Sequence, residues 1–321
     1  MDPALKYTIL AVLIITLLCA GTGCTIRQID LEGTIPAIPP YYAQNSGNLK
    51  VYFIDVGQGD AELLTCENFT MLIDAGDPDA GTRVVSTLKN LGITDIDILV
   101  ATHPHADHIG GMQDVLKNFR VHRVIDTGMP HTTGTYQKFL ETIDRQKIPY
   151  NNVNVGDVIS PVQGLSFLVL NAPAGTGISP GDEDLNDASI VLRVSYGQIN
   201  MLFEGDAGTA VEDRMIASGF PLESQVLKVA HHGSSHGTGG AFLARVRPEV
   251  AVISVGAGNP YGHPAAATLD RLTSAGAIIF RTDQDGTIVI RSDGMKYSVT
   301  TAKGGLYGVS PTPALTSTAS A

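Results

Sequence analysis

T-H-P-H-A-D-H at residues 102–108 places three imidazoles and one carboxylate within six consecutive positions. The apolar run at residues 96–101 comes directly before it and is typical of a strand buried on both faces. In an extended loop alternate side chains point the same way, so His103 and His105 can bind one cation through their ring nitrogens. We therefore expect a metal-binding loop at the end of a buried strand, where α/β enzymes place ligands.

Asp107 and His108 follow in the same stretch, at the start of a helix that we expect to begin near Ile109. The helical turn directs both side chains toward a second cation. Two ions about 3.5 to 4 Å apart can clamp both sides of an in-line displacement. A solvent-facing loop without ligands is the alternative, and it would suit a single histidine better than this spacing.

The rest of the chain alternates short apolar runs with helical patterns, in two series. Strands in two series with helices between them predict an α/β fold with two β-sheets packed face to face and helices outside. Strands are expected at residues 49–56, 61–66, 70–74, 96–101, 121–126, 165–170, 189–195, 200–203, 226–230, 250–255 and 278–281, and helices at 82–91, 135–146, 210–218, 241–246 and 265–275.

Composition limits the possible functions. The chain has 321 residues, and its 21 Lys and Arg against 32 Asp and Glu give a formal charge of -11. This charge argues against a broad surface that tracks nucleic-acid phosphates. Trp is absent and Tyr and Phe are few, so no aromatic platform for stacking single-stranded bases is visible. Cys66 is the only cysteine of the expected domain, which excludes a disulfide within it.

Residues 1–27 are predicted to be a signal peptide or membrane anchor. No residue between Lys6 and Arg27 is charged, and residues 7–20 are almost wholly aliphatic. Cleavage and retention both remain open. Cys24 follows small residues, which resembles a degraded lipoprotein cleavage box and adds lipidation as a third possibility. We expect the protein to be membrane-anchored facing outside, or secreted.

The remaining boundaries follow from composition. Residues 28–48 carry Pro, Asn, Gly and Ser without an apolar period, which predicts a linker. The folded domain is expected at residues 49–302. Residues 303–321 are rich in small and polar residues, which predicts a disordered tail.

Five further motifs accompany the stretch at residues 102–108 in a fixed order. With H-x-H-x-D-H after a buried strand, they resemble the metallo-β-lactamase superfamily, and within it the hydrolase domain of the ComEC-type competence proteins and their free-standing relatives. The resemblance covers residues 50 to about 292 and implies an αββα four-layer sandwich that works as a dinuclear metal-dependent hydrolase. The motifs are F-I-D-V-G-Q-G-D at 53–60, L-I-D-A-G at 72–76, L-F-E-G-D at 202–206, L-K-V-A-H-H-G-S at 227–234 and N-P-Y-G-H-P at 259–264.

The resemblance implies that ligands also come from the second half of the chain. Asp206 is expected to bridge both metals, and one imidazole of the H-H-G-S motif to complete the second site with Asp107 and His108. Because adjacent residues on an extended chain point apart, only one of His231 and His232 should be a ligand, and we favour His232 slightly. The other would face the substrate or donate a hydrogen bond. Asp107 is expected to act in catalysis as well as in metal binding.

The first metal site departs from the superfamily pattern. Many members have a further histidine before the bridging Asp, whereas this chain has L-N-D-A-S-I-V-L with Asn186 and Ser189, which fits the competence-type branch. His103, His105 and Asp206 would then leave an open position that suits a phosphate oxygen. A simple Asx turn before a strand explains Asn186 and Ser189 equally well.

Other residues are expected around the centre. The resemblance places His263 at the mouth of the site, where it could bind an anionic substrate or protonate the leaving oxygen; a plain surface histidine is the alternative. Gly57 and Gly59 are expected to serve backbone conformation. Residues expected to orient ligands, close tight turns or contact substrate are Asp55, Gln58, Asp60, Asp74 and Ser234. Surface or structural roles are the default for His122, His131 and His236.

The predicted activity is hydrolysis of a phosphodiester by a two-metal centre. Mixed imidazole and carboxylate ligands favour Zn²⁺, and the shortage of histidine at the first site keeps Mn²⁺ possible. The resemblance implies extracellular DNA or nucleotide phosphodiesters as substrates, while the acidic charge leaves small phosphodiesters such as phosphorylcholine esters in contention. β-Lactam hydrolysis fits less well, because the third histidine is replaced. A tethered, non-catalytic metal-binding domain that assists DNA uptake is the non-enzymatic alternative.

Overall fold

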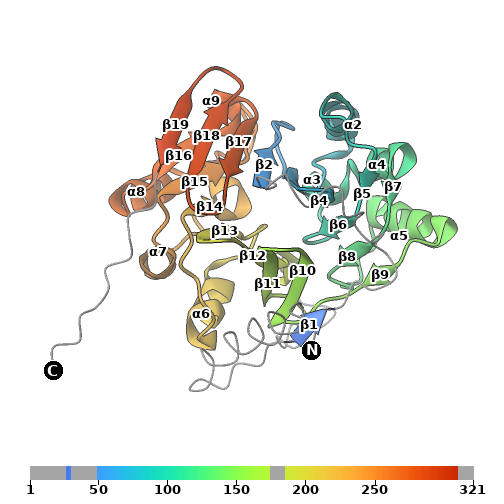
Figure 1. The fold of residues 1–321 in the computed structure, drawn as a ribbon, viewed down its shortest axis with the longest axis horizontal. Helices are drawn as coiled ribbons and strands as arrows, with labels where there is room; N and C mark the ends of the chain where they lie inside the picture. The colour runs from blue at the N-terminus through green and yellow to red at the C-terminus, as the bar shows by residue number, and fades with distance from the viewer. Residues whose placement is uncertain (1–26, 30–48, 174–184, 310–321) are drawn as a thin grey trace, which may run out of the picture.

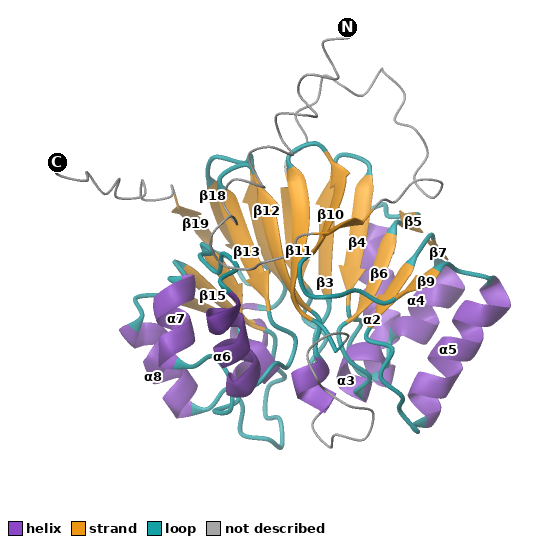
Figure 2. Cartoon of the chain, turned by 90° about the horizontal axis from the view of Figure 1, so that it is seen from below, coloured by secondary structure: helices purple, strands orange, loops and turns teal. Residues whose placement is uncertain are grey.

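The computed structural model describes residues 27–29, 49–173 and 185–309. Two mixed β-sheets lie against each other and helices cover their outer faces (Figure 1). In the view from below, helices flank the paired sheets on both sides (Figure 2). The predicted α/β fold, an αββα four-layer sandwich, is confirmed.

The first sheet has nine strands in the order β19-β18-β17-β2-β3-β4-β6-β8-β9. Its middle part, β4-β6-β8, is parallel, and β6 is buried along its whole length, as the apolar run before the metal-binding loop predicted. The strands are β2 (Leu49–Phe53), β3 (Glu62–Cys66), β4 (Phe69–Ile73), β6 (Ile98–Ala101), β8 (Val124–Asp126), β9 (Tyr150–Asn151), β17 (Ile288–Ser292), β18 (Tyr297–Thr301) and β19 (Leu306–Val309), with a separate pair of β5 (Asp95–Ile96) and β7 (Arg120–Val121).

The second sheet has eight strands in the order β1-β10-β11-β12-β13-β14-β15-β16. Strands β13 to β16 run parallel, so their carboxyl ends meet at one edge. The strands are β1 (Arg27–Ile29), β10 (Asp157–Val162), β11 (Leu165–Asn171), β12 (Val191–Tyr196), β13 (Ile199–Phe203), β14 (Val226–Lys228), β15 (Val250–Ile253) and β16 (Ile278–Arg281).

The helices divide between the two sheets. An apolar cluster joins α2, α4 and α5 to the outer face of the first sheet, and another joins α6, α7 and α8 to the second. The helical segments are η2 (Pro78–Ala80), α2 (Gly81–Asn90), α3 (Ala106–Ile109), α4 (Met112–Asn118), α5 (Gly134–Gln146), η3 (Leu185–Ala188), α6 (Thr209–Ser218), η4 (Ala230–Gly233), α7 (Gly240–Val246), α8 (Ala266–Ser274) and α9 (Thr282–Asp285).

The main core fills the space between the sheets. Alternate residues of β2 point into it, with Leu49, Val51 and Phe53 almost fully buried. Phe53 stacks on Phe203 of the opposite sheet, with ring centroids 5.9 Å apart and planes 12° apart. Burying each such ring contributes roughly 1.5 to 3 kcal/mol. The core therefore fixes the ends of β2 and β13, from which two of the site loops continue.

Two predicted boundaries are wrong in part. The tail was predicted to be disordered from residue 303, but residues 306–309 form β19 and pair antiparallel with β18. The linker was predicted to start at residue 28, but residues 27–29 form β1 and pair with β10. Local composition misses both strands, because their backbone hydrogen bonds come from distant segments.

The predicted anchor, its Cys24 cleavage box, most of the linker and the end of the tail lie outside the described residues and remain predictions. Within the part of the chain that the structure describes, no helix is long and apolar enough to cross a membrane.

Candidate metal centre

The centre is built by loops that leave the carboxyl ends of β6, β13 and β14. The first loop continues from β6 into α3, which begins at Ala106, three residues earlier than predicted. His103 and His108 are fully buried. His105 immediately precedes α3, and its Nδ1 lies 3.0 Å from Nε2 of His103. The two imidazoles predicted to share a cation therefore turn ring nitrogens toward each other.

Asp206 stands between the imidazoles of both halves. Its Oδ1 lies 3.2 Å from Nε2 of His108 and 3.8 Å from Nε2 of His232. Its Oδ2 lies 3.8 Å from Nε2 of His103 and 3.7 Å from Nε2 of His231. Each carboxylate oxygen thus faces a different pair of imidazoles.

The two adjacent histidines occupy different environments. Both have left-handed backbone conformations, with φ of 48° at His231 and 54° at His232, so the extended chain assumed above is wrong. His232 is buried, and its Nε2 lies 3.2 Å from Oδ2 of Asp107. His231 is partly exposed, and its ring lies 5.6 Å from that of His263. His232 therefore lies in the centre and His231 toward its mouth.

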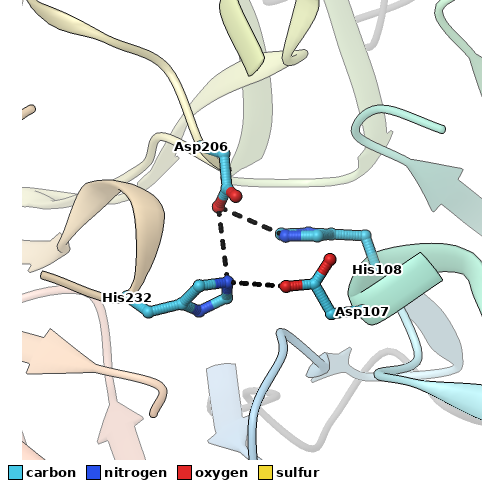
Figure 3. Close-up of side chains that lie close together, drawn as sticks. All are labelled: Asp107, His108, Asp206 and His232. Atoms are coloured by element: carbon cyan, nitrogen blue, oxygen red, sulfur yellow. Dashed lines mark hydrogen bonds and ion pairs between the residues drawn. The ribbon is translucent and has the colours of Figure 1, made fainter. Parts of the chain in front are cut away.

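Four side chains form a compact group of candidate ligands (Figure 3). Asp107, His108, Asp206 and His232 each offer one ligand atom, and these atoms all lie within 4.8 Å of one another. Nε2 of His108 and Oδ1 of Asp206 are buried, and neither makes a hydrogen bond to another described residue. The two atoms face each other at 3.2 Å, and a cation between them would satisfy both. The residues fit a divalent ion with imidazole and carboxylate ligands.

Asp74 holds His108 from behind. It accepts hydrogen bonds from the backbone N and the Oγ1 of Thr102, at 2.9 and 2.6 Å, and its Oδ2 lies 2.7 Å from Nδ1 of His108. A carboxylate at one ring nitrogen fixes the tautomer and leaves the other nitrogen to bind a metal. The predicted orienting role of Asp74 is supported by this geometry.

Asp60 and the backbone hold His232 in a similar way. Nδ1 of His232 is 3.0 Å from the carbonyl oxygen of Ser254 and 3.3 Å from Oδ1 of Asp60. Nε2 therefore remains directed at Asp107 and Asp206. His103 has Thr102 Oγ1 at 3.2 Å and Ser189 Oγ at 3.4 Å from its Nδ1.

The buried carboxylates of the centre stabilise positive charge on their neighbours. Burial raises the pKa of Asp206, but His108 and His232 outweigh it and hold the pKa well below its usual range. Burial lowers the pKa of His108, but Asp206 and Asp74 raise it well above its usual value. For His232 burial is likewise outweighed by Asp206 and Asp60, which raise its pKa to about 10. Protons on these imidazoles supply the charge that a divalent cation would supply in their place.

His103 behaves differently from these two imidazoles. Burial and the neighbouring His108 lower its pKa well below the usual value. It is therefore neutral at neutral pH, which is the state that binds a metal.

A cavity of about 330 Å³ opens above the group. His263 lies in its wall, and Nδ1 of this residue is buried without a hydrogen bond to any described residue. Burial first, and then His231 and His232, lower the pKa of His263. The lining residues are Gln58, His105, Ala106, Asp107, Asn186, Asp206, His231, His232, Tyr261 and His263.

Several predicted residues shape the loops. Oδ1 of Asp55 accepts a hydrogen bond from the backbone N of Gly57 at 3.2 Å, so Asp55 closes the tight turn. Oε1 of Gln58 accepts from the backbone N of Gly256 at 3.2 Å. Gly59 has φ of 124°, and a Cβ there would lie 2.3 Å from the carbonyl oxygen of Asp107. The expected backbone role of the glycines is confirmed.

The loops of the second half contain the remaining predicted residues. Oγ of Ser189 accepts a hydrogen bond from the backbone N of Asp206 at 3.0 Å, which ties the residue after η3 to the backbone of Asp206. Asn186 lines the cavity. Ser234 is buried, and its Oγ accepts from the backbone N of His236 at 3.3 Å, so it stabilises the turn after the adjacent histidines.

Three residues near the centre were missed. Lys228 is buried and bonds to Asp60; a charged residue inside an apolar strand was the available signal. Tyr261 is 67% exposed and stacks on His263, with ring centroids 5.9 Å apart and planes 21° apart. One exposed aromatic ring therefore lies at the cavity. His131, given no role, lies with its ring 6.1 Å from that of His105.

The fold and the ligand group define a class of protein. Residues 54–257 match the family model of the metallo-beta-lactamase superfamily, and the chain belongs to this superfamily. It is a metal-dependent hydrolase of the metallo-β-lactamase fold, related to the ComEC-type competence proteins.

Two curated relatives give the more particular similarity. The chain is 30% identical over 312 residues to ComE operon protein 3 of Bacillus subtilis (strain 168), covering 90% of this chain and 39% of that protein. It is 30% identical over 289 residues to competence protein ComA of Neisseria gonorrhoeae, covering 88% of this chain and 38% of that protein. The chain therefore spans about two fifths of the length of these relatives.

Solved structures agree on the fold. The metallo-beta-lactamase fold protein YhfI from Bacillus subtilis matches with a TM-score of 0.50 and 10% identity, over 75% of this chain and 98% of that chain. Igni18, a metallo hydrolase from the archaeon Ignicoccus hospitalis KIN4/I, matches with a TM-score of 0.50 and 16% identity, over the same shares of 75% and 98%.

Proposed function

We propose that this protein hydrolyses phosphodiesters at a centre of two divalent cations, and that its substrate is DNA or a nucleotide phosphodiester. The observation that carries the proposal is the position of Asp206. One of its oxygens faces His108 and His232, and the other faces His103 and His231. This disposition suits a carboxylate shared by two ions.

The ligands divide into two sets around that carboxylate. Asp107, His108 and His232 would hold one ion with Asp206. His103 and His105 would hold the other, which leaves a position open for a phosphate oxygen. When bound, the ions supply Lewis acidity and activate water for attack on phosphorus. Imidazole and carboxylate ligands together suit Zn²⁺, with Mn²⁺ as the alternative.

His263 would act on the substrate from the cavity wall. Its lowered pKa keeps the ring neutral at neutral pH, so one ring nitrogen carries a proton and the other accepts. A neutral imidazole can donate a hydrogen bond to a phosphate oxygen or transfer its proton to the leaving oxygen. His231, whose ring lies 5.6 Å away, is placed to contact the same group.

Tyr261 supports a substrate that carries a nucleobase. Its exposed ring lies at the cavity and stacks on His263, so a base next to the scissile phosphate can extend the stack. Asn259 orders this loop, since its Nδ2 donates to the carbonyl oxygens of Gly256 and His263 at 3.0 and 2.6 Å. The backbone of the loop is thus ordered before substrate binds.

The charge of the cavity and of the chain favours a site that contacts only a short segment of the substrate. Neither Lys nor Arg lines the cavity among the described residues, and the formal charge of the chain is -11. Phosphate contacts would then come from the metal ions and the imidazoles rather than from a basic stripe. A small phosphodiester such as a phosphorylcholine-like ester is the second candidate, because a cavity of about 330 Å³ would admit it.

For location we propose that the domain faces the outside, either anchored in the membrane or secreted. The uncharged run between Lys6 and Arg27 supports this proposal. DNA outside the cell would then be within reach of the site.

The test compares substrates and metals on the full-length protein. Hydrolysis of bis-p-nitrophenyl phosphate, a single-stranded oligonucleotide and p-nitrophenyl phosphorylcholine would be measured with Zn²⁺ or Mn²⁺. The control is the His103→Ala, Asp107→Ala double variant. We expect metal-dependent turnover of the first two substrates, which the double variant loses. Metal binding without turnover of any substrate would instead favour a non-catalytic accessory domain for DNA uptake.

A further inference from the structure

A buried lysine lies directly behind the metal centre. Lys228 is the last residue of β14 and is 1% exposed. Its Nζ donates a hydrogen bond to Oδ2 of Asp60 at 2.7 Å and a second one to the carbonyl oxygen of Val229 at 3.0 Å. Lysine is seldom fully buried in proteins unless it is paired, and here the pairing is with a carboxylate that is itself 1% exposed.

Asp60 connects this lysine to the candidate ligands. Its Oδ1 lies 3.3 Å from Nδ1 of His232. Its backbone N donates to the carbonyl oxygen of Asp107 at 3.2 Å, and its own carbonyl oxygen accepts from the backbone N of Gly76 at 2.8 Å. A shift of Asp60 would therefore displace contacts to two candidate ligands, His232 and Asp107, at the same time.

The ion pair also joins the two sheets. Asp60 lies in the turn between β2 and β3 of the nine-stranded sheet, whereas Lys228 ends a strand of the eight-stranded sheet. In the ligand group, Asp107 and His108 come from α3, which follows β6 of the first sheet, and His232 comes from η4, which follows β14 of the second. The spacing of the ligands thus depends on how the sheets are fixed to each other at this point.

A buried ion pair is a weak source of stability. A buried ion pair loses hydration on both sides, and apolar residues of similar size often replace one without loss of stability. On the His108 side, Asp74 accepts hydrogen bonds from the neutral hydroxyl and the backbone N of Thr102, which directly follows β6 of the same sheet. On the His232 side, the charged Lys228 of the eight-stranded sheet donates to Asp60 of the nine-stranded sheet and holds it.

We propose that Lys228 is a positioning residue for the His232 side of the metal centre. It holds Asp60 in place, and Asp60 keeps Nε2 of His232 directed at Asp107 and Asp206. This inference rests on the proposed metal centre. Loss of the pair should weaken binding of the ion held by His232 and leave the ion held by His103 and His105 in place.

The test removes both charges together, because a single substitution would leave the other charge buried and unpaired. The Lys228→Met, Asp60→Asn double variant would be titrated with Co²⁺ against a competing chelator, with visible absorption reporting the coordination. His232→Ala identifies which of the two binding events belongs to the second site. The matched control is Arg27→Met with Asp157→Asn, which removes the bidentate ion pair between β1 and β10.

We expect the double variant to fold and to lose about 10- to 100-fold in affinity at the second site only. The control should bind both ions as the parent does. If the double variant does not fold, Lys228→Arg, which keeps the charge but changes the geometry of its contact with Asp60, should show the same selective loss. Unchanged binding in the folded variant, or equal weakening at both sites, would overturn the proposal.

The readout separates this inference from the proposed function. Two bound ions without any phosphodiester turnover would contradict the proposed activity, and the role of Lys228 would still be decided by the two affinities. A parent protein that binds no second ion would overturn both.

Discussion

At the scale of single residues, the orientation of each imidazole is the main determinant of the centre. Nδ1 of His108 faces Asp74, and Nδ1 of His232 faces Ser254 and Asp60, so both Nε2 atoms turn inward. A ligand whose outer nitrogen is held in this way loses little freedom when a metal binds.

Asp74→Asn tests this orientation. The amide cannot serve both Thr102 and His108 as the carboxylate does, and it makes His108 a weaker base. We expect the affinity for the second ion to fall about 10- to 100-fold, measured by chelator competition. Asp55→Asn, in a turn outside the ligand group, is the control and should stay close to the parent. Equal affinities for the two variants would show that Asp74 does not orient His108.

Tyr261 gives a prediction about substrate. Stacking of a base on an aromatic side chain contributes about 1 to 3 kcal/mol, so Tyr261→Ala should raise KM for a short single-stranded oligonucleotide about 5- to 150-fold. The value of kcat should change little, because stacking acts on substrate and transition state alike.

Two controls sharpen that prediction. Tyr261→Phe keeps the ring and should retain the parental KM. An oligonucleotide with an abasic site next to the scissile phosphate should bind the parent about as weakly as the normal oligonucleotide binds Tyr261→Ala. If KM for the normal oligonucleotide is unaffected by Tyr261→Ala, no base stacks there.

At the scale of elements, tight turns set the approach of the loops. The turn after β2 passes so close to the loop after β6 that only glycine fits at position 59, where a Cβ would lie 2.3 Å from the carbonyl oxygen of Asp107. The atom in the way is backbone and cannot move aside as a side chain would.

Gly59→Ala should therefore displace the segment that contains Asp107. We expect a loss of second-site metal affinity together with a lower melting temperature. Gly92→Ala is the control: this glycine also has a positive φ, 75°, but no described atom lies within 4 Å of its added Cβ. It should reduce stability by the backbone strain alone and leave metal affinity unchanged. A Gly59→Ala variant that binds metal normally would contradict the close approach.

The docking of β1 predicts a pH dependence. Burial raises the pKa of Asp157, but hydrogen bonds from Arg27 and Asn154 outweigh it, and the pKa lies below its usual value. A depressed folded pKa contributes stability in full above the unfolded value of about 3.9, and that contribution is lost as pH falls through the folded pKa.

The difference in free energy of unfolding between the parent and Asp157→Asn should accordingly be constant from about pH 5 to 7 and shrink below about pH 4. Urea titrations at several pH values would measure it. A difference that stays constant down to about pH 2 would show that the carboxylate is not paired as described.

At the scale of the whole molecule, residue spacing alone predicted the local part of the site, whereas Asp206 and His232 were predicted only through the resemblance to the superfamily. His103, His105, Asp107 and His108 occur within one short stretch, so their spacing alone indicates a metal site. The position of His232 depends on left-handed backbone at two successive residues. The next residue is Gly233, where a Cβ would lie 2.5 Å from Pro264.

Pairings across the sheets were also invisible in the sequence. Lys228 and Asp60 are 168 positions apart, and nothing in either local pattern relates them. Strand β19 was missed for a similar reason, since its Gly-containing sequence becomes a strand only by pairing with β18. The order of the strands and helices could be predicted because hydrophobic periodicity is local.

The central claim is that Asp206 lies between two cations. A crystal structure of the protein soaked in Mn²⁺, with anomalous data collected for that element, tests it most directly. We predict two anomalous peaks about 3.5 to 4 Å apart, one beside each oxygen of Asp206. A single peak among Asp107, His108 and His232, with none beside His103 and His105, would contradict the claim.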